Sequence, residues 1–234
     1  MQTLPAPLRA LVFDLDGTLA DTFNHLADCF ATALEPNLGR RVRPEEVFSR
    51  FGLWAGPEIS ILADLAGGHY PEVVEAFYQV YQERHPRAVR LFPGIAEVID
   101  AAQKRGLRLG LLTGKGRRAT EITLEQLGIR QHFTTLMTGD DAPFPKPHPD
   151  GLLLVLRALE AETSEALFVG DSRADVGAGR AAGVFTAWAG WNRAFAETLT
   201  DDMAPDHVLA EPADLLRLLT SAVGEARNGN THHG

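Results

Sequence analysis

Short, almost entirely apolar runs alternate with helix-like segments over most of this 234-residue chain. The apolar runs are LRALVFD (8–14), RLGLLT (108–113), ALFVG (166–170) and VFTAWAG (184–190), and TTLMTG (134–139) is a less apolar candidate strand. Strands that are apolar on both faces are typical of parallel sheets covered by helices on both sides. Helical patterns between the runs end at glycines, as IAEVIDAAQKR does at Gly106 and RATEITLEQL at Gly128. The alternation predicts an α/β fold with a Rossmann-like parallel sheet.

Residues 19–89 interrupt the alternation, because they contain no run that predicts a strand. Apolar side chains recur there at helical spacing, in Phe23, Leu26, Ala27, Phe30 and Leu34. Further helical stretches begin at Pro44, Pro57 and Pro71, since the first turn of a helix tolerates proline. We therefore expect a helical-bundle cap of residues 19–89 inserted into a core of residues 1–18 and 90–223. The polar residues 224–234 are expected to form a disordered tail.

Charge and composition narrow the classes of partner. The net charge of −9 disfavours nucleic acid as the main partner, because phosphate backbones attract basic proteins. No apolar run is long enough to span a bilayer, and the N-terminal residues lack the pattern of a signal peptide. The single cysteine, Cys29, has no internal disulfide partner, which fits a reducing compartment. We expect a cytoplasmic protein without a nucleic-acid or membrane partner.

Polar residues gather at the points where the predicted strands end. They are Asp14, Asp16 and Thr18 after the first strand, Thr113 and Gly114 after the second, Lys146 in the loop PFPKPHPD, and Asp171 and Asp175 after ALFVG. Ligands of open α/β sheets bind beyond the carboxyl ends of the strands, so these residues are expected to converge. Clustered carboxylates suit Mg²⁺, whereas a hydroxyl, an ammonium and backbone N–H groups suit phosphate oxygens.

Four of these motifs together resemble those of the haloacid dehalogenase superfamily. They are DLDGT at 14–18, the threonine that closes the second strand, the lysine of a KPxP loop, and GDSxxD at 170–175. Helices inserted directly after the first motif resemble the C1 cap of that superfamily. Within it, the chain is most similar to phosphoglycolate phosphatase-like hydrolases.

The resemblance implies a role for each motif residue in a two-step phosphoryl transfer. Asp14 would attack phosphorus and form an aspartyl phosphate, and Asp16 would act as general acid and then as general base. Mg²⁺ would be held by Asp14, the backbone carbonyl of Asp16, and Asp171, with Asp175 binding through water or orienting the other ligands. Phosphoryl oxygens would be held by Thr113 and Lys146, assisted by Thr18 and by backbone N–H groups near Leu15 and Gly114.

Several of these residues also have an ordinary structural explanation. An isolated Asp-x-Asp-Gly is more often a turn than a site, and Asp171 alone would be taken for a helix cap. Metal binding and a helix-dipole contact explain Asp175 about equally well. The basic run of Lys115, Arg117 and Arg118 is typical of a solvated face. It is the combination of motifs that favours a site at this edge.

The cap is expected to discriminate between substrates by their leaving groups. FGLWAGPEI (51–59) is the expected contact loop, with Trp54 as a bulky wall or, about as often for such a residue, a buried core side chain. Arg50 is the nearest cation for a substrate carboxylate. The lack of lysine between Thr18 and Leu91 disfavours phosphonoacetaldehyde hydrolases, which use a cap lysine, and Asp16 disfavours dehalogenases, which have no alkoxide to protonate.

These observations predict a Mg²⁺-dependent phosphatase that hydrolyses small organic phosphomonoesters resembling phosphoglycolate. The alternatives on the same scaffold are a phosphomutase or phosphotransferase, a pyrophosphatase, and a binding module without catalysis. A binding module usually lacks a catalytic residue, whereas Asp14, Asp16, Thr113, Lys146 and Asp171 are all present. The expected partner is a small phosphorylated metabolite, and the expected assembly is a monomer or a homodimer.

Overall fold

The structure is a computed structural model that describes residues 4–51, 57–68, 70–193, 199 and 203–228. Its centre is a six-stranded sheet in the order β5-β4-β1-β6-β7-β8, and all neighbouring strands are parallel. The strands are β1 (Ala10–Phe13), β4 (Arg108–Leu112), β5 (Thr135–Met137), β6 (Ala166–Gly170), β7 (Phe185–Ala189) and β8 (His207–Leu209). This is the strand order of a doubly wound Rossmann-like sheet, with the direction of winding reversed at β1.

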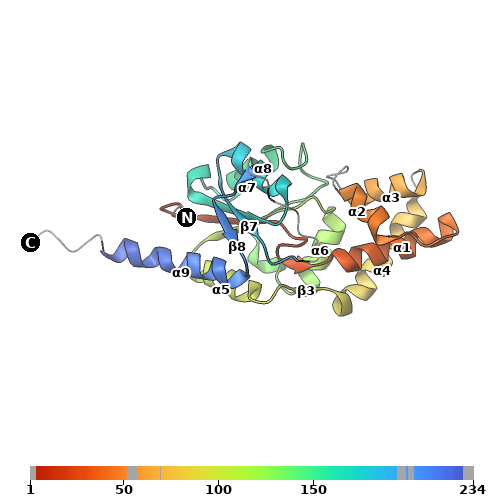
Figure 1. Ribbon diagram of the computed structural model, residues 1–234, viewed down its shortest axis with the longest axis horizontal. Helices are drawn as coiled ribbons and strands as arrows, with labels where there is room; N and C mark the ends of the chain where they lie inside the picture. Colours follow the sequence, from red (N-terminus) through yellow and green to blue (C-terminus); the bar gives the residue numbers. More distant parts are fainter. Residues whose placement is uncertain (1–3, 52–56, 69, 194–198, 200–202, 229–234) are drawn as a thin grey trace, which may run out of the picture.

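Alternate residues of each strand face opposite sides of the sheet, and helices cover both sides. On one side, Leu11 and Phe13 of β1 belong to an apolar cluster with residues of α5 (Ile95–Lys104), α6 (Arg117–Gln126) and α9 (Pro212–Asn228). On the other, Ala10 and Val12 pack with α7 (Asp150–Ala158) and α8 (Arg173–Ala182). Figure 1 shows α5 and α9 together on one side and α7 and α8 on the other.

Helices α1 (Phe23–Leu38), α2 (Pro44–Phe51), α3 (Glu58–Ala66) and α4 (Pro71–Ala88) form a separate bundle beyond the sheet (Figure 1). We call this bundle the cap. Its apolar cluster includes Phe30, Phe77 and Tyr81, and it also takes in Ala119, with Ile122 packed against it, from helix α6. The chain enters the cap through β2 (Ala20–Asp21) and leaves it through β3 (Arg90–Leu91), which pair antiparallel.

The structure differs from the sequence-based expectations in three places. Strand β8 was not expected, because the charged residues Asp206 and Glu211 lie close on either side of its three residues. Neither was the two-residue pair of β2 and β3. Helix α9 runs to Asn228, so residues 224–228 are helical rather than part of a disordered tail. A single glycine costs a helix only about 1 kcal/mol, and Gly224 does not end this one.

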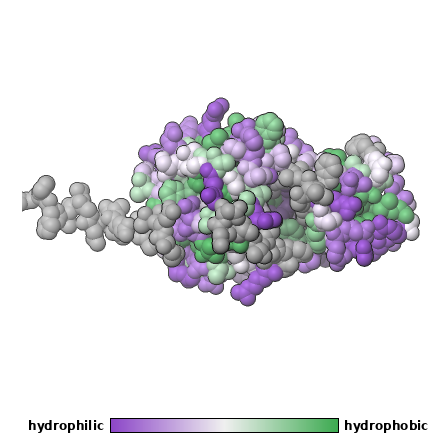
Figure 2. Space-filling model, turned by 45° about the horizontal axis from the view of Figure 1, so that its top comes forward, coloured by the Kyte–Doolittle hydropathy of each residue, from purple (hydrophilic) through white to green (hydrophobic). Residues whose placement is uncertain are grey.

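Two short 3₁₀ helices, Arg130–His132 and Thr163–Glu165, complete the described elements. On the face shown in Figure 2, hydrophilic residues are interspersed with smaller groups of hydrophobic ones over both the core and the cap. Within the part of the chain that the structure describes, no helix is long and apolar enough to cross a membrane.

Candidate active site

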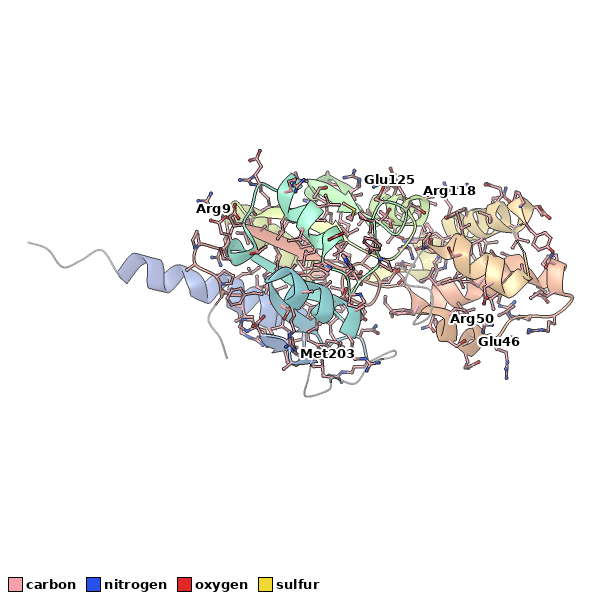
Figure 3. The ribbon with its side chains drawn as sticks, turned by 90° about the horizontal axis from the view of Figure 1, so that it is seen from above. Arg9, Glu46, Arg50, Arg118, Glu125 and Met203 are labelled. Atoms are coloured by element: carbon pink, nitrogen blue, oxygen red, sulfur yellow. The ribbon has the colours of Figure 1, made fainter. Side chains whose placement is uncertain are left out.

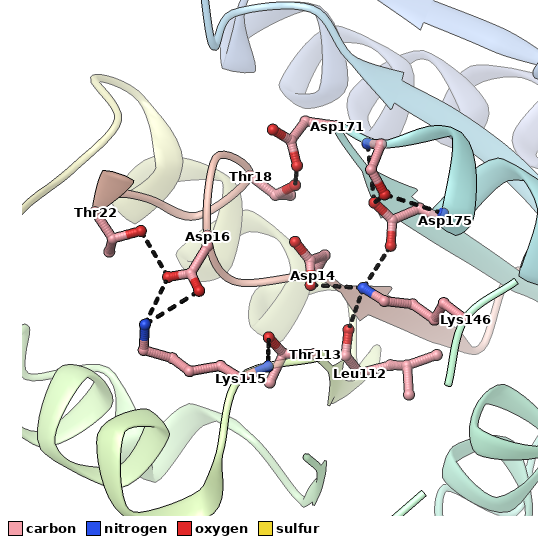
Figure 4. Close-up of polar contacts among 11 residues, drawn as sticks. Asp14, Asp16, Thr18, Thr22, Leu112, Thr113, Lys115, Lys146, Asp171 and Asp175 are labelled. Atoms are coloured by element: carbon pink, nitrogen blue, oxygen red, sulfur yellow. Dashed lines mark hydrogen bonds and ion pairs between the residues drawn. The ribbon is translucent and has the colours of Figure 1, made fainter. Parts of the chain in front are cut away.

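The carboxyl end of β1 brings the predicted motif residues together at one edge of the sheet (Figure 4). Asp14 follows β1 directly, and its backbone N–H donates to the Val169 carbonyl of β6 at 2.9 Å. The neighbouring strands contribute Thr113 after β4 and Asp171 after β6. The edge where the winding reverses is the expected ligand site of such a sheet, and the sequence placed these residues there correctly.

Lys146 links two carboxylates of this edge. Its Nζ lies 2.8 Å from Oδ1 of Asp14 and 2.6 Å from Oδ1 of Asp175, and it also donates to the Leu112 carbonyl at 3.3 Å. All three charged side chains are largely buried. Burial lowers the pKa of Lys146, but the attraction of Asp14 and Asp175 outweighs burial and raises it. The lysine therefore supplies a permanent positive charge beside Asp14.

Asp175 has a structural role as well as a place in this cluster. Ser172 is the N-cap of α8, and the Asp175 Oδ2 accepts from the Ser172 backbone N–H at 3.0 Å and from its hydroxyl at 2.6 Å. Its other oxygen accepts from Lys146. This reciprocal capping box holds Asp175 rigidly, so the residue both caps the first turn of α8 and orients the lysine.

Asp171 is held by donors from two other segments. The Thr18 hydroxyl donates to its Oδ1 at 3.2 Å, and the Asn192 side-chain amide donates to its Oδ2 at 2.8 Å. Gly17 makes this approach possible: its φ is +81°, and a Cβ there would collide with the Asp171 carboxylate and the Asn192 amide. A residue with a side chain at position 17 would displace Asp171 from the site.

Asp14, Asp171 and Asp175 form a buried carboxylate cluster, with one oxygen of each lying within 4.8 Å of the others. Burial raises the pKa of Asp14 to about 7, and the neighbouring Asp175 adds to the rise although Lys146 opposes it. Burial also raises the pKa of Asp171 well above its usual range, with Asp14 and Asp175 adding repulsion. Clustered carboxylate oxygens are the donors that Mg²⁺ prefers, so this donor set fits the cation that the sequence predicted.

Asp16 points away from this cluster toward the cap. Its Oδ1 accepts from the Thr22 hydroxyl at 2.6 Å, and its two oxygens lie 3.2 and 3.1 Å from Nζ of Lys115. Lys115 is buried, so the expectation of a solvated basic run is wrong for this residue. Its ammonium also lies 3.6 Å from Oε1 of Glu58, the first residue of cap helix α3.

The remaining predicted residues have different positions. Thr113 is buried, and its hydroxyl accepts from the Lys115 backbone N–H at 3.2 Å. Arg50 lies in the cap beside Glu46 (Figure 3), where its Nε donates to Asp64 at 3.0 Å. Substrate binding by Thr113, Gly114 and Arg50 stays a prediction. Trp54 lies outside the described residues.

Sequence reasoning did not place three residues in the site: Lys115, which contacts Asp16, Asn192, which contacts Asp171, and Glu58, which is linked to Asp16 only through Lys115. Asn192 follows the end of β7, so the rule that found Asp14 and Asp171 also points to it. The sequence offers no comparable signal for Glu58, because its position beside the core depends on how the cap packs.

The family model of haloacid dehalogenase-like hydrolases matches residues 11–189, a span that contains every core motif residue described above. The chain belongs to this family. The hydrolase class and the family resemblance expected from the motifs are thereby confirmed.

The chain is also similar to three individual proteins, one matched by sequence and two by structure. Pyrophosphatase PpaX of Bacillus velezensis is 32% identical over 211 residues, covering 90% of this chain and 96% of that protein. A predicted phosphoglycolate phosphatase from Haemophilus somnus shares the fold with a TM-score of 0.76 at 24% identity, over 91% of this chain and 98% of that one. The structure of CbbY from Rhodobacter sphaeroides in complex with phosphate has a TM-score of 0.74 with this chain at 25% identity. The match covers 91% of this chain and 99% of CbbY. The expected α/β fold of this family is confirmed.

Proposed function

We propose that this hydrolase is a Mg²⁺-dependent phosphatase that acts on small phosphorylated metabolites through an aspartyl phosphate on Asp14. The observation that carries the proposal is the position of Lys146, whose ammonium bridges Asp14 and Asp175 within a buried carboxylate cluster. A cation held 2.8 Å from Asp14 can also attract the oxygens of a phosphoryl group that approaches that carboxylate.

In the first step, an Asp14 oxygen attacks phosphorus and the bond from phosphorus to the leaving oxygen breaks. Asp16, in its protonated form, transfers its proton to the leaving oxygen, so an alcohol departs rather than an alkoxide. Lys146 neutralises charge on the phosphoryl oxygens, and Thr113 with the N–H groups near Leu15 and Gly114 holds them in place. The product of this step is an aspartyl phosphate.

In the second step, water attacks the same phosphorus and the bond to Asp14 breaks. Asp16, now a carboxylate, takes one proton from the attacking water and is ready for the next cycle. Phosphate leaves with the new oxygen. One residue thus serves as acid and then as base.

The metal would be held by Asp14 and Asp171, by the backbone carbonyl of Asp16, and directly or through water by Asp175. When bound, it would supply charge neutralisation to the carboxylate cluster and to the phosphoryl group. Thr18 and Asn192 fix the Asp171 carboxylate by hydrogen bonds, as outer partners of metal ligands commonly do.

Phosphate release from a panel of substrates tests the proposal. The panel contains phosphoglycolate, sugar phosphates, nucleotides and pyrophosphate, each with Mg²⁺ and with chelator. We expect release with Mg²⁺ and a loss of at least about tenfold with chelator, because the clustered carboxylates then repel the anionic substrate. No release from any member by folded, metal-loaded protein would overturn the phosphatase assignment.

A pyrophosphatase is the second candidate, and the PpaX relatives support it. The chemistry at Asp14 is the same, since only the leaving group differs. Pyrophosphate releases a phosphate that needs less help from a proton donor than an alkoxide does. Preference for pyrophosphate over every phosphomonoester in the panel would support this candidate.

Asp16→Asn is expected to separate the two proton transfers. For an alkyl phosphate, kcat/KM should fall by about 10²–10⁴-fold, the usual range for general acid–base catalysis. For p-nitrophenyl phosphate, whose leaving group departs without a proton, kcat/KM should change little. The kcat of both substrates should fall, because both require water to be deprotonated. Unchanged rates on the alkyl ester would remove Asp16 from the mechanism.

We infer that the cap, residues 19–89, closes over this edge and that the core consists of residues 1–18 and 90–223. Buried contacts between Glu58 of the cap and the β4–α6 loop support closure at this edge. Closure would exclude water that competes for the phosphoryl group.

A further inference from the structure

Lys115 stands between a carboxylate of the site and a carboxylate of the cap. Its ammonium lies 3.1 Å from Asp16 and 3.6 Å from Glu58, and it also sits 5.0 Å from the centre of the Tyr81 ring on cap helix α4. The Lys115 side chain is only 1% exposed and that of Glu58 only 5%. Two cap helices therefore enclose the lysine that contacts Asp16.

Glu58 also joins the cap to the backbone of the core. Its Oε2 accepts from the backbone N–H of Gly116 at 2.9 Å, and Gly116 is the N-cap of α6. A carboxylate at the N-terminus of a helix is favoured by the helix dipole. The second oxygen, Oε1, is buried without a hydrogen-bond partner among the described residues, and it faces the Lys115 ammonium.

The loop that receives Glu58 lacks a side chain at the point of contact. A Cβ on Gly116 would lie 2.6 Å from the Glu58 Oε2 and 3.2 Å from the Pro57 Cβ, both too close for ordinary packing. The φ of Gly116 is −64°, so its backbone does not itself require glycine. Space for the cap is therefore a sufficient reason for glycine at position 116.

Stability alone does not explain this arrangement. Burying an ammonium and its carboxylates costs desolvation energy that the attraction between them often only offsets. A surface pair that joins the same two parts of the molecule is already present, where Arg118 of α6 lies 2.7 Å from Glu75 of α4. Unlike this surface pair, the buried pair contains a cation that also contacts Asp16.

We propose that Glu58 is a positioning residue of the cap that acts through Lys115 to hold Asp16 in place for proton transfer. The inference rests on the proposed function, since it assigns Asp16 the role of acid and base. When the cap is docked, Glu58 and Tyr81 fix the ammonium, and the ammonium fixes both oxygens of Asp16. When Glu58 leaves Gly116, Lys115 gains water and its hold on Asp16 weakens. The position of the cap thus determines how firmly Asp16, the proton donor, is held.

Glu58→Gln tests this chain of contacts with little change of shape. An amide oxygen can still accept from Gly116, but the charge that faces Lys115 is removed. We expect kcat/KM for an alkyl phosphate of the panel to fall at least about tenfold and that for p-nitrophenyl phosphate less than about threefold. This is the pattern of a misplaced proton donor, as in Asp16→Asn but weaker.

Glu75→Gln is the matched control, because it removes the charge from the exposed cap-to-core pair. Both kcat/KM values should stay at the wild-type level. An equal fall on both esters in Glu58→Gln, or no fall on either, would overturn the positioning role. No phosphate release by the wild type from any substrate would contradict the proposed function itself. Normal release by the wild type together with unchanged kcat/KM values in Glu58→Gln would contradict only the role of Glu58.

A second variant and a second measurement guard against a misfolded protein. Gly116→Ala should displace Glu58 by steric contact and reproduce the unequal loss, with the cooperative thermal unfolding of the wild type retained. Hydrogen exchange of the Gly116 amide reports docking without any substrate. We expect faster exchange in Glu58→Ala and wild-type exchange in Glu75→Gln. Unchanged Gly116 protection in Glu58→Ala would contradict the docking contact.

Discussion

Asp14→Asn is expected to abolish phosphate release, and in metal-free buffer above pH 7 it should leave the protein at least as stable as the wild type. The asparagine amide cannot form an aspartyl phosphate, so both chemical steps are lost. The pKa of Asp14 is raised by burial to about 7, which means that its ionised form destabilises the folded state. The stability associated with the protonated form is lost as the pH rises from about 4 through 7. Asparagine is neutral at every pH, so the variant does not lose this stability as the pH rises.

The expected gain in unfolding free energy at pH 8 is limited to the order of 1–3 kcal/mol, because Lys146 loses one of its two carboxylate partners at the same time. Urea unfolding with chelator at pH 5 and pH 8 measures it, and the difference from the wild type should be larger at pH 8. Asp21→Asn, which changes an exposed carboxylate, should leave both activity and stability unaltered. Measurable turnover by Asp14→Asn would exclude Asp14 as the nucleophile.

Lys146→Met should lower kcat by at least about 10³-fold and also destabilise the fold. The ammonium is the cation that bridges Asp14 and Asp175, so its loss leaves two buried carboxylates facing each other. Breaking a buried ion pair on one side typically costs about 3–5 kcal/mol. Unlike Asp14→Asn, this change should reduce activity and unfolding free energy together.

Lys104→Met is the matched control for Lys146→Met. Lys104 forms an exposed pair with Asp100 one helical turn away, at 2.6 Å, and such pairs contribute only about 0.3–0.5 kcal/mol. Urea unfolding and phosphate release should both stay close to wild type. A stability loss in Lys146→Met no larger than in Lys104→Met would show that the buried lysine does not hold the carboxylate cluster together.

The parts of the fold that the sequence predicted are those with strong local patterns. The five runs that predicted strands became β1, β4, β5, β6 and β7, and the polar residues after them met at one edge because parallel strands share a carboxyl end. The pair of β2 and β3 is too short for periodicity to reveal, and β8 lies between the charged residues Asp206 and Glu211, so these strands could be found only from their pairing with a neighbouring strand.

The site was predictable where it follows from the sheet and unpredictable where it follows from the cap. Asp14, Lys146 and Asp171 could be placed from strand ends and loops alone. Lys115 could not, because a lysine beside Arg117 and Arg118 has the sequence pattern of a solvated face. Its burial depends on Glu58 and Tyr81, which are distant in sequence and reach it only through the packing of α3 and α4.

The apolar cluster of the cap is not made by the cap alone. Ala119, with Ile122 packed against the same cluster, comes from α6, which also lies on the central sheet through Leu124. The two parts therefore share a helix rather than merely touching, and the bundle is not an interchangeable module. A cap grafted from a relative would bring its own complementary face, and it would need a matching α6 before it could seat on this core.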